Sequence, residues 1–279
     1  MFNANSAFGQ TVRVLLLGAF ITLAQGAFAQ DFIKGGEETF VLNLGAILNQ
    51  FDTTFRLDGE GIRGSDVNLE SNGLEKDISS FQASATLRFL SRNRIDLLYF
   101  QAKRSGDHRL EETLVIDDHV FPVNFNLSTE LKNQFLIADY RFSFVKTDPI
   151  EFAGLIGVYG ADVKYNASAT GVISGISQTV STSASTTVPL PLIGVTLDWY
   201  INPRWKIWGS VAGFSAHISN VDGSIFVAGV ATDFMLTRNF GLGLSYLYTN
   251  LNADVNRSDF SGSVDWKTNG VSAYAQLKF

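Results

Sequence analysis

Segments of about ten residues in which apolar and polar side chains alternate recur along this chain, and they limit its fold more than any other feature. The final segment, 270–279, places its apolar side chains on one face: Val271, Ala273, Ala275, Leu277 and Phe279. Similar alternation covers 40–49, 81–89, 136–144, 193–199, 226–234 and 240–249. Side chains of a β-strand point alternately to opposite faces. Repeated segments of this length are typical of transmembrane β-strands.

The connections between these segments alternate in length. Short gaps at 91–94, 146–149, 202–203 and 237–239 hold Asn, Asp, Pro and Arg, which favour turns. Longer connections span roughly 50–79, 105–130, 166–187 and 252–263, and 219–223 reads as a tight hairpin. Segment 166–187 is typical of a flexible surface loop, although its Val-Ile and Thr-Val pairs could extend the strands beyond the membrane. Short turns on one side and long loops on the other indicate an outer-membrane barrel. The pattern predicts an all-β fold, a closed antiparallel transmembrane β-barrel with both termini in the periplasm.

Ten strands are predicted if the segments near 95–104, 151–165 and 205–217 all cross the membrane. Both faces of these three segments carry apolar residues, so their phase is ambiguous. Eight strands remain an alternative, in which two weak segments form loop hairpins. A soluble barrel with the aromatic residues inside is a further alternative. A sheet that spans lipid must close, because its edge groups have no water to bond.

The first residues have the pattern of a secretory signal. Arg13 is the only charge before the apolar run 14–23, and Ala27-Phe28-Ala29 offers a small-x-small cleavage site before Gln30. A short membrane anchor is the alternative, but the run is shorter than the roughly 20 residues that a spanning helix needs. We therefore expect a signal peptide at 1–29 and a barrel domain at 30–279.

Composition narrows the functional classes. The chain has no cysteine, which excludes disulfides and thiolate metal sites. It carries 27 Asp+Glu against 21 Lys+Arg, a net charge of −6 that becomes −7 once Arg13 is removed. An acidic chain without basic runs does not fit a nucleic-acid partner. Acidic segment 66–70 lacks the glycine and the frame of an EF-hand, so no metal and no cofactor is expected.

Aromatic residues predicted to face outward cluster near the short turns, as in an interfacial girdle. They are Phe40, Phe89, Phe142, Phe144, Trp199, Phe234, Phe240 and Phe279. Together with the signal-like start, the alternating strands, the Gly-rich segment 239–246 and the terminal Phe279, they resemble the small outer-membrane β-barrel family of Gram-negative bacteria, which includes OmpA-type and OmpX-type barrels. No soluble C-terminal domain is expected after the last strand.

This resemblance implies a location in the outer membrane after signal cleavage. It implies contact with outer-membrane lipid and lipopolysaccharide. It also implies that Phe279 is an assembly signal read by the barrel assembly machinery. The family's motifs describe architecture, so the extracellular partner and the physiological role stay open.

Charged side chains on the predicted inner face lie a few residues before the short turns. Arg88, Asp139, Arg141, Asp198 and Asp233 should form one layer in the periplasmic half of the lumen, and Arg94 and Asp96 join them if their strand has the expected phase. One interpretation is a charged constriction that selects solutes. The other, which we favour because both signs occur, is a structural layer of paired charges that fills a small barrel.

No catalytic residue is predicted. His108 and His119 share one long connection with several aspartates. Proteases of the omptin type use Asp and His at the extracellular rim, but this pattern matches no such arrangement on paired strands. His217 and Ser219 resemble the His-x-Ser of outer-membrane lipid A deacylases only faintly: Asp222 and Asp233 are the only nearby acids that could orient the histidine, and the family's glutamate has no evident match. We expect a non-enzymatic barrel with a structural or surface-interaction role. A narrow channel for small or apolar solutes is the alternative, and a hydrolase is the third hypothesis.

Overall fold

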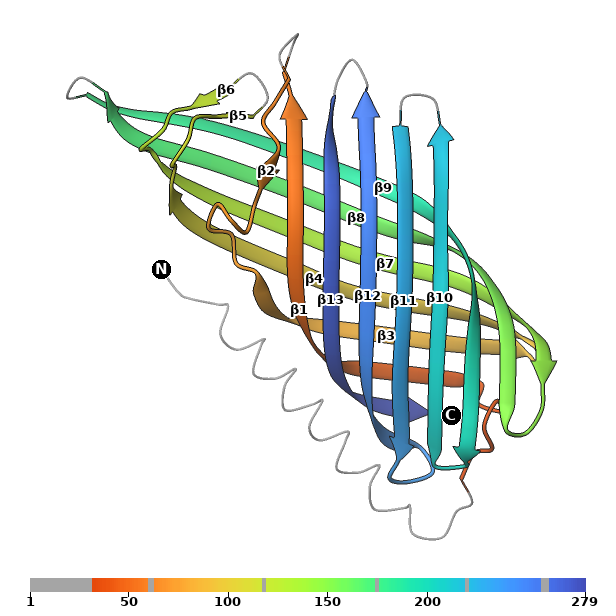
Figure 1. Ribbon diagram of the computed structural model, residues 1–279. Coiled ribbons are helices and arrows are strands. Elements are labelled where there is room, and N and C mark those ends of the chain that lie inside the picture. Colours follow the sequence, from red (N-terminus) through yellow and green to blue (C-terminus); the bar gives the residue numbers. More distant parts are fainter. Residues whose placement is uncertain (1–31, 60–62, 117–118, 174–175, 219–220, 257–260) are drawn as a thin grey trace, which may run out of the picture.

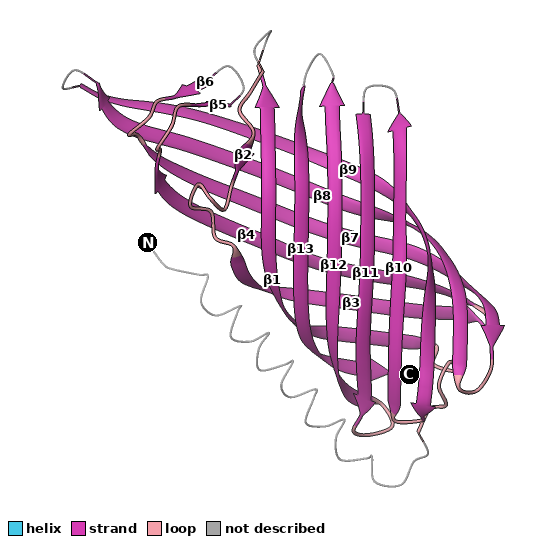
Figure 2. Ribbon diagram, viewed as in Figure 1, coloured by secondary structure: helices cyan, strands magenta, loops and turns pink. Residues whose placement is uncertain are grey.

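The computed structural model describes residues 32–59, 63–116, 119–173, 176–218, 221–256 and 261–279. These residues form strands and connections only (Figures 1 and 2). The long strands are β1 (Phe40–Asp58), β3 (Asp77–Leu90), β4 (Asn93–Arg109), β7 (Asn126–Lys146), β8 (Ile150–Ile173), β9 (Ile176–Asn202), β10 (Trp205–Ile218), β11 (Val221–Met235), β12 (Phe240–Asn256) and β13 (Ser261–Lys278). The short strands are β2 (Val67–Asn68), β5 (Leu114–Ile116) and β6 (His119–Phe121).

The long strands form a closed antiparallel ring. Their order is β13-β12-β11-β10-β9-β8-β7-β4-β3-β1, and β13 also pairs with β1. This closing ladder runs from Val41 opposite Lys278 to Asp58 opposite Ser261. The described residues thus contain a ring of ten long strands, to which β2 adds a two-residue pairing with β1. The closed barrel predicted from the sequence is confirmed, and the three segments of ambiguous phase are strands of its wall.

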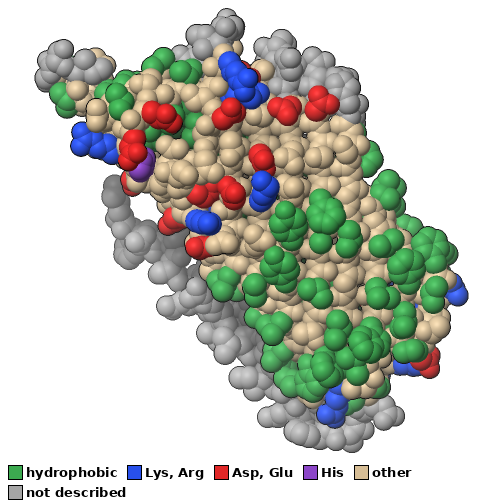
Figure 3. Space-filling model, in the orientation of Figure 1, with side chains coloured by type: hydrophobic (Ala, Val, Ile, Leu, Met, Phe, Trp, Pro, Cys, Tyr) green, Lys and Arg blue, Asp and Glu red, His purple; other side chains and the backbone are tan. Residues whose placement is uncertain are grey.

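The outer face carries an apolar belt. Exposed aromatic side chains gather at the end of the short turns, as predicted: Phe40, Phe89, Phe142, Phe144, Trp199, Phe234 and Phe279. Phe240, also predicted to face outward, is half-buried. Figure 3 shows hydrophobic side chains over the lower half of the wall formed by β1 and β10 to β13, with charged ones above them. No helix in the described part of the chain is long and apolar enough to cross a membrane.

The short turns lie where the sequence placed them. Residues 166–187 were interpreted as a flexible loop, with extension of the flanking strands as the alternative. The alternative is confirmed, because these residues continue β8 and β9 as a paired hairpin up to Ile173 opposite Ile176. The Thr, Val and Ile residues of this segment suit an extended strand. Val180 and Ala184 also pack against a buried loop cluster, which gives this hairpin an apolar side.

The hairpin makes one side of the barrel taller than the other. The outer parts of β4, β7, β8 and β9 slant beyond the remaining strands, and the β5–β6 hairpin lies over them (Figure 1). Leu114, Ile116 and Phe121 of this small hairpin are buried with Ala167 and Ala169 of β8. We call the outer parts of β7, β8 and β9, residues 126–135, 160–173 and 176–192, the protruding sheet.

Candidate functional site in the lumen and at a free strand edge

The predicted charged layer exists at the short-turn end of the lumen, and we call it the charged base. Arg88, Asp139, Asp198 and Asp233 are at most 8% exposed there, and the Arg141 side chain is 13% exposed. Strand alternation turns these residues inward because their neighbours in the sequence are apolar and face lipid. The structure therefore brings all five predicted residues into one region.

One half of the charged base is a chain of ion pairs across the lumen. Arg88 donates two hydrogen bonds of 2.9 Å to the carboxylate of Glu151. Arg94 lies 3.9 Å from Glu151 and 2.6 Å from Asp198. Glu151 also accepts a hydrogen bond from the hydroxyl of Ser143. Each buried charge in this chain has an opposite charge beside it, as burial requires.

A second group of charges shares Arg94. Arg141 lies 2.5 Å from Asp139 and 3.1 Å from Asp96, and Asp96 is 3.5 Å from Arg94. The side chain of Asp96 thus connects two guanidinium groups. Arg94 and Asp96 were expected to join the layer only if β4 had the right phase, and this phase is confirmed.

Asp233 is held on the other side of the lumen by two different donors. Its carboxylate lies 3.2 Å from Lys206 Nζ and accepts a 2.5 Å hydrogen bond from the hydroxyl of Tyr274. Gly243 leaves room for the Tyr274 ring, because a Cβ at this position would lie 2.2 Å from a ring carbon. The Gly-rich alternation of β12 therefore positions a tyrosine of β13.

Sequence reasoning missed Glu151 and Lys206. Both are the second residue of their strand, in β8 and β10, where apolar residues on both faces hid the phase. Glu151 is 1% exposed and is the partner of two arginines. Glu151 and Lys206 lie directly after a short turn, whereas the predicted charges lie just before one. Nearness to a short turn was therefore the signal that could have found them.

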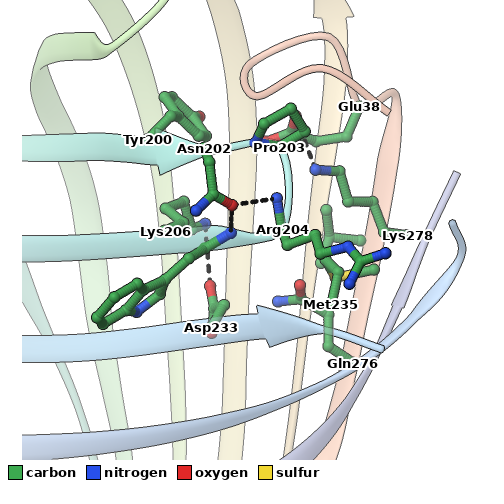
Figure 4. A pocket seen from close by; sticks show the side chains of 12 residues that line it. Glu38, Tyr200, Asn202, Pro203, Arg204, Lys206, Asp233, Met235, Gln276 and Lys278 are labelled. Atoms are coloured by element: carbon green, nitrogen blue, oxygen red, sulfur yellow. Dashed lines mark hydrogen bonds and ion pairs between the residues drawn. The ribbon is translucent and has the colours of Figure 1, made fainter. Parts of the chain in front are cut away.

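The segment before β1 covers the short-turn mouth of the barrel. Lys278 donates to the carbonyl of Ile33 at 3.3 Å and lies 3.9 Å from Glu38. Lys34 lies 2.7 Å from Asp148, and this hydrogen bond raises the pKa of Lys34. Figure 4 shows the small pocket that remains at the mouth, with Lys206 directed at Asp233.

The middle of the lumen is filled by rings, which we call the aromatic layer: Phe51, Phe100, Phe135, Tyr159 and Trp266. All five are at most 4% exposed. Phe135 lies at the centre, with its ring centroid 4.6 Å from that of Phe100 and 4.7 Å from that of Trp266. A cavity of about 160 Å³ lies between this layer and the charged base, lined by Arg94 and Asp96 as well as by Leu155 and Leu192.

A buried arginine lies next to the aromatic layer, on the side away from the charged base. Arg104 has its guanidinium 4.2 Å from the centre of the Phe51 ring and is 0% exposed. It pairs with Glu70 from the connection between β1 and β3, and it donates a 3.0 Å hydrogen bond to Thr53. This cation ties the extracellular connection to the lumen wall. Sequence reasoning did not single it out.

The structure places the residues considered for catalysis in separate strands, apart from position 217, which lies opposite the candidate acid Asp222. His108 lies in β4 opposite Leu127, and His119 lies in β6 opposite Ile116. Ser219 lies outside the described residues, and position 217 pairs with position 222 in the β10–β11 ladder. Within the described ranges, no group of three or more His, Cys, Asp or Glu side chains could hold a metal ion.

The protruding sheet ends in a free strand edge. β9 pairs with β10 only between Asn202 and Ile193, which lies opposite Gly213. From Leu192 to Ile176, the described pairing of β9 is with β8 alone. This stretch of 17 residues carries no charged side chain. Its second edge therefore presents backbone donors and acceptors that no described strand takes up.

Two prolines identify which positions face the free side. Pro189 and Pro191 lie opposite Gly160 and Val158 in an unbroken ladder with β8. Successive residues of an antiparallel strand bond alternately to its two neighbours, and proline has no N–H to donate. Their nitrogens thus point to the free side, and so do the N–H groups of the other odd-numbered positions: Ser177, Thr179, Ser181, Ser183, Ser185 and Thr187.

No family model matches the chain, and no curated protein matches it. Among solved structures, the outer membrane protease OmpT from Escherichia coli superposes with a TM-score of 0.58 at 9% identity, over 90% of this chain and 99% of that one. The translocator domain of the autotransporter NalP from Neisseria meningitidis reaches a TM-score of 0.47 at 12% identity, over 98% of both chains. The toluene transporter TodX from Pseudomonas putida reaches 0.35 at 10% identity, over 90% of both.

At such low identity the likeness to OmpT concerns the fold alone. The closed ring of strands, its outward apolar belt and this superposition agree with one another. The chain therefore has the fold of the small outer-membrane β-barrel proteins.

Proposed function

We propose that this chain is a non-enzymatic outer-membrane barrel that binds an extended polypeptide segment at the free edge of β9, after cleavage of the signal at 1–29. The observation that carries the proposal is the end of the β9–β10 ladder at Ile193, with the next 17 residues of β9 paired to β8 only. This function is a surface interaction, in which the membrane part of the barrel acts as a scaffold.

The chemistry of the edge supports such a role. Exposed edges are usually protected by charges, prolines, bulges or short strands. Here Pro189 and Pro191 protect the base of the edge, while 176–188 has neither charge nor proline. An extended peptide that adds a strand to a sheet gains affinity from main-chain hydrogen bonds. Small Ser and Thr side chains beside the edge leave room for a partner with bulkier, uncharged residues.

Proline substitution tests the edge directly, because the N–H groups of odd-numbered positions point to the free side and those of even-numbered positions point to β8. Ser181→Pro combined with Ser183→Pro removes two N–H groups from the free edge without removing a β8–β9 hydrogen bond. We expect loss of binding of a synthetic ten-residue peptide of alternating Thr and Val, measured by fluorescence anisotropy on the folded barrel. Hydrogen exchange of the amides of 177–187 should slow when the peptide binds to the unmodified protein.

The matched control is Thr182→Pro, because the N–H of Thr182 is directed at β8 and the substitution removes it. This variant should loosen the hairpin and accelerate exchange in β8 as well. Binding of the peptide that persists in the Ser181→Pro, Ser183→Pro variant would overturn the edge proposal.

A narrow channel is the second candidate, and the cavity of about 160 Å³ beside the charged base favours it. Against it stands the aromatic layer, because five rings at most 4% exposed fill the lumen above that cavity. We expect purified protein in planar bilayers to give little or no ion conductance. Large and stable conductance steps would favour the channel over the scaffold.

A further inference from the structure

Three lysines lie opposite one another on the outer face of adjacent strands. Lys103 of β4 pairs with Lys132 of β7, and Lys132 pairs with Lys164 of β8. Their side chains are 63%, 49% and 57% exposed, respectively. With neighbouring strands about 4.8 Å apart, the row extends roughly 10 Å around the barrel. We call these residues the lysine row.

Like charges directly opposite each other destabilise a sheet, and the neighbouring acids compensate them only in part. Glu130 lies 3.0 Å from Lys103 and 2.7 Å from Lys132, while Asp162 is 3.7 Å from Lys164. Within these ion pairs, three positive side chains face two negative ones, which leaves one positive charge in excess, while the carboxylate of Glu75 accepts a 3.3 Å hydrogen bond from the Ser105 N–H. A bound anion would stabilise this arrangement of like charges.

The row lies just beyond the apolar belt. Lys103 and Lys132 are four residues further out than Tyr99 and Leu136, which are 36% and 50% exposed on the same outer faces. Four residues rise about 13 Å along a strand, or roughly 10 Å along the membrane normal at a tilt of about 40°. Lysine side chains reach back toward an interface, so these ammonium groups are placed at the polar layer of the outer leaflet.

The opposite wall has a different arrangement at the same distance from its belt. Lys267 of β13 is four residues beyond Val271, which is 54% exposed. Its rung neighbours are Asp52 and Asn250, and Asp265 lies 3.6 Å away. One positive and two negative side chains give an excess negative charge. Figure 3 shows this wall, with charged side chains scattered above the hydrophobic ones.

We propose that the lysine row binds the phosphate groups of a glycolipid in the outer leaflet. Lysine binds phosphate as a point charge, and several lysines in line can contact a headgroup that carries more than one phosphate. The lipid would then occupy one side of the barrel, against the membrane-side part of the protruding sheet, where Lys132 and Lys164 lie. This proposal does not depend on the edge of β9, where we propose a polypeptide partner.

The test uses the folded barrel in neutral detergent, with native mass spectrometry and titration of purified lipopolysaccharide. The same glycolipid after phosphatase treatment and inorganic phosphate alone are the comparison ligands. Replacing all three lysines (Lys103→Gln, Lys132→Gln, Lys164→Gln) should weaken glycolipid binding about tenfold, equivalent to about 1.4 kcal/mol. Lys267→Gln, the matched control on the opposite wall, should bind like the unmodified protein.

Glu130→Gln provides a second, opposite readout. It removes the carboxylate that neutralises Lys103 and Lys132, so it should raise glycolipid affinity severalfold, whereas a merely structural ion pair predicts no gain. Equal binding by the triple variant, or by the dephosphorylated glycolipid, would overturn the proposal. Inorganic phosphate that competes as strongly as the lipid would overturn the lipid assignment.

Discussion

The charged base and the aromatic layer both close the lumen, but by different physical means. In the charged base, each of Arg88, Arg94 and Arg141 has a carboxylate within 2.9 Å. In the aromatic layer, Phe135 contacts neighbouring rings and needs no partner of opposite charge. Buried ion pairs contribute little net stability, yet removing one member is costly. Buried rings contribute through their apolar area.

This difference predicts which part of the lumen tolerates amino-acid substitutions. A ring can lose atoms while its neighbours relax to fill part of the space. A charge cannot lose its partner without leaving the other charge alone in a medium of low polarity. The base is therefore specific in its pairing, and the layer is more tolerant in its packing. The four predictions below test this contrast.

The largest effect is expected for Glu151→Ala, which leaves Arg88 and Arg94 without their shared carboxylate. The free energy of unfolding, measured by urea titration in lipid vesicles, should fall by about 3–5 kcal/mol. Asp233→Ala should be costly for the same reason. Glu37→Ala is the control, because the Glu37 side chain is 62% exposed and its change should stay within about 0.5 kcal/mol. An unchanged unfolding midpoint for Glu151→Ala would mean that the charges of the base are not effectively buried.

A somewhat smaller loss is expected in the aromatic layer. Phe135→Ala removes the central ring, and we expect a loss of about 3 kcal/mol, since large-to-small changes leave a cavity that closes only partly. The same urea titration measures it. Phe226→Ala, on the outer face at 44% exposure, is the matched control and should cost less. A Phe135→Ala loss larger than that of Glu151→Ala would reverse the comparison between layer and base.

Gly243→Ala tests the packing that supports the base, because the added methyl group meets the Tyr274 ring. Overpacking of this kind costs about 1–3 kcal/mol, and it should weaken the hydrogen bond from Tyr274 to Asp233. Gly209→Ala is the control, since a Cβ there would meet only the Gly229 carbonyl oxygen at 3.6 Å. Thermal unfolding followed by circular dichroism distinguishes the two variants. Equal stability of both would show that Tyr274 can move without cost.

The smallest effect on stability is expected for Phe279→Ala, because this side chain lies on the outer face and contributes to neither layer of the lumen. The backbone of Phe279 donates to the Phe40 carbonyl at 2.8 Å and accepts from Thr39 at 2.7 Å, and the substitution keeps these bonds. The free energy of unfolding in detergent should change by less than about 1 kcal/mol, because the side chain is 50% exposed. In cells, folded protein in the outer membrane should fall if Phe279 is the assembly signal. Unchanged membrane levels would refute that role.

Sequence alternation was enough to predict most of the barrel and most of its charged base. Arg88 and Asp139 sit in strands whose two faces differ strongly in polarity, so their inward position followed from period two. Glu151 and Lys206 sit in strands that are apolar on both faces, and the same reasoning could not decide their direction. The outer ends of β8 and β9 were left open between loop and strand, because a run of Ser, Thr and Ala is compatible with both.

The sequence by itself determined the fold class, the position of the short turns and the outward direction of the aromatic belt, because these depend on local alternation and turn chemistry. Only the tertiary structure decided which charges meet, that rings fill the middle of the lumen, and that β9 leaves β10 at Ile193. These features depend on register between strands far apart in the chain. Period two sets which face a side chain takes, but it does not set which residue lies across the lumen from it.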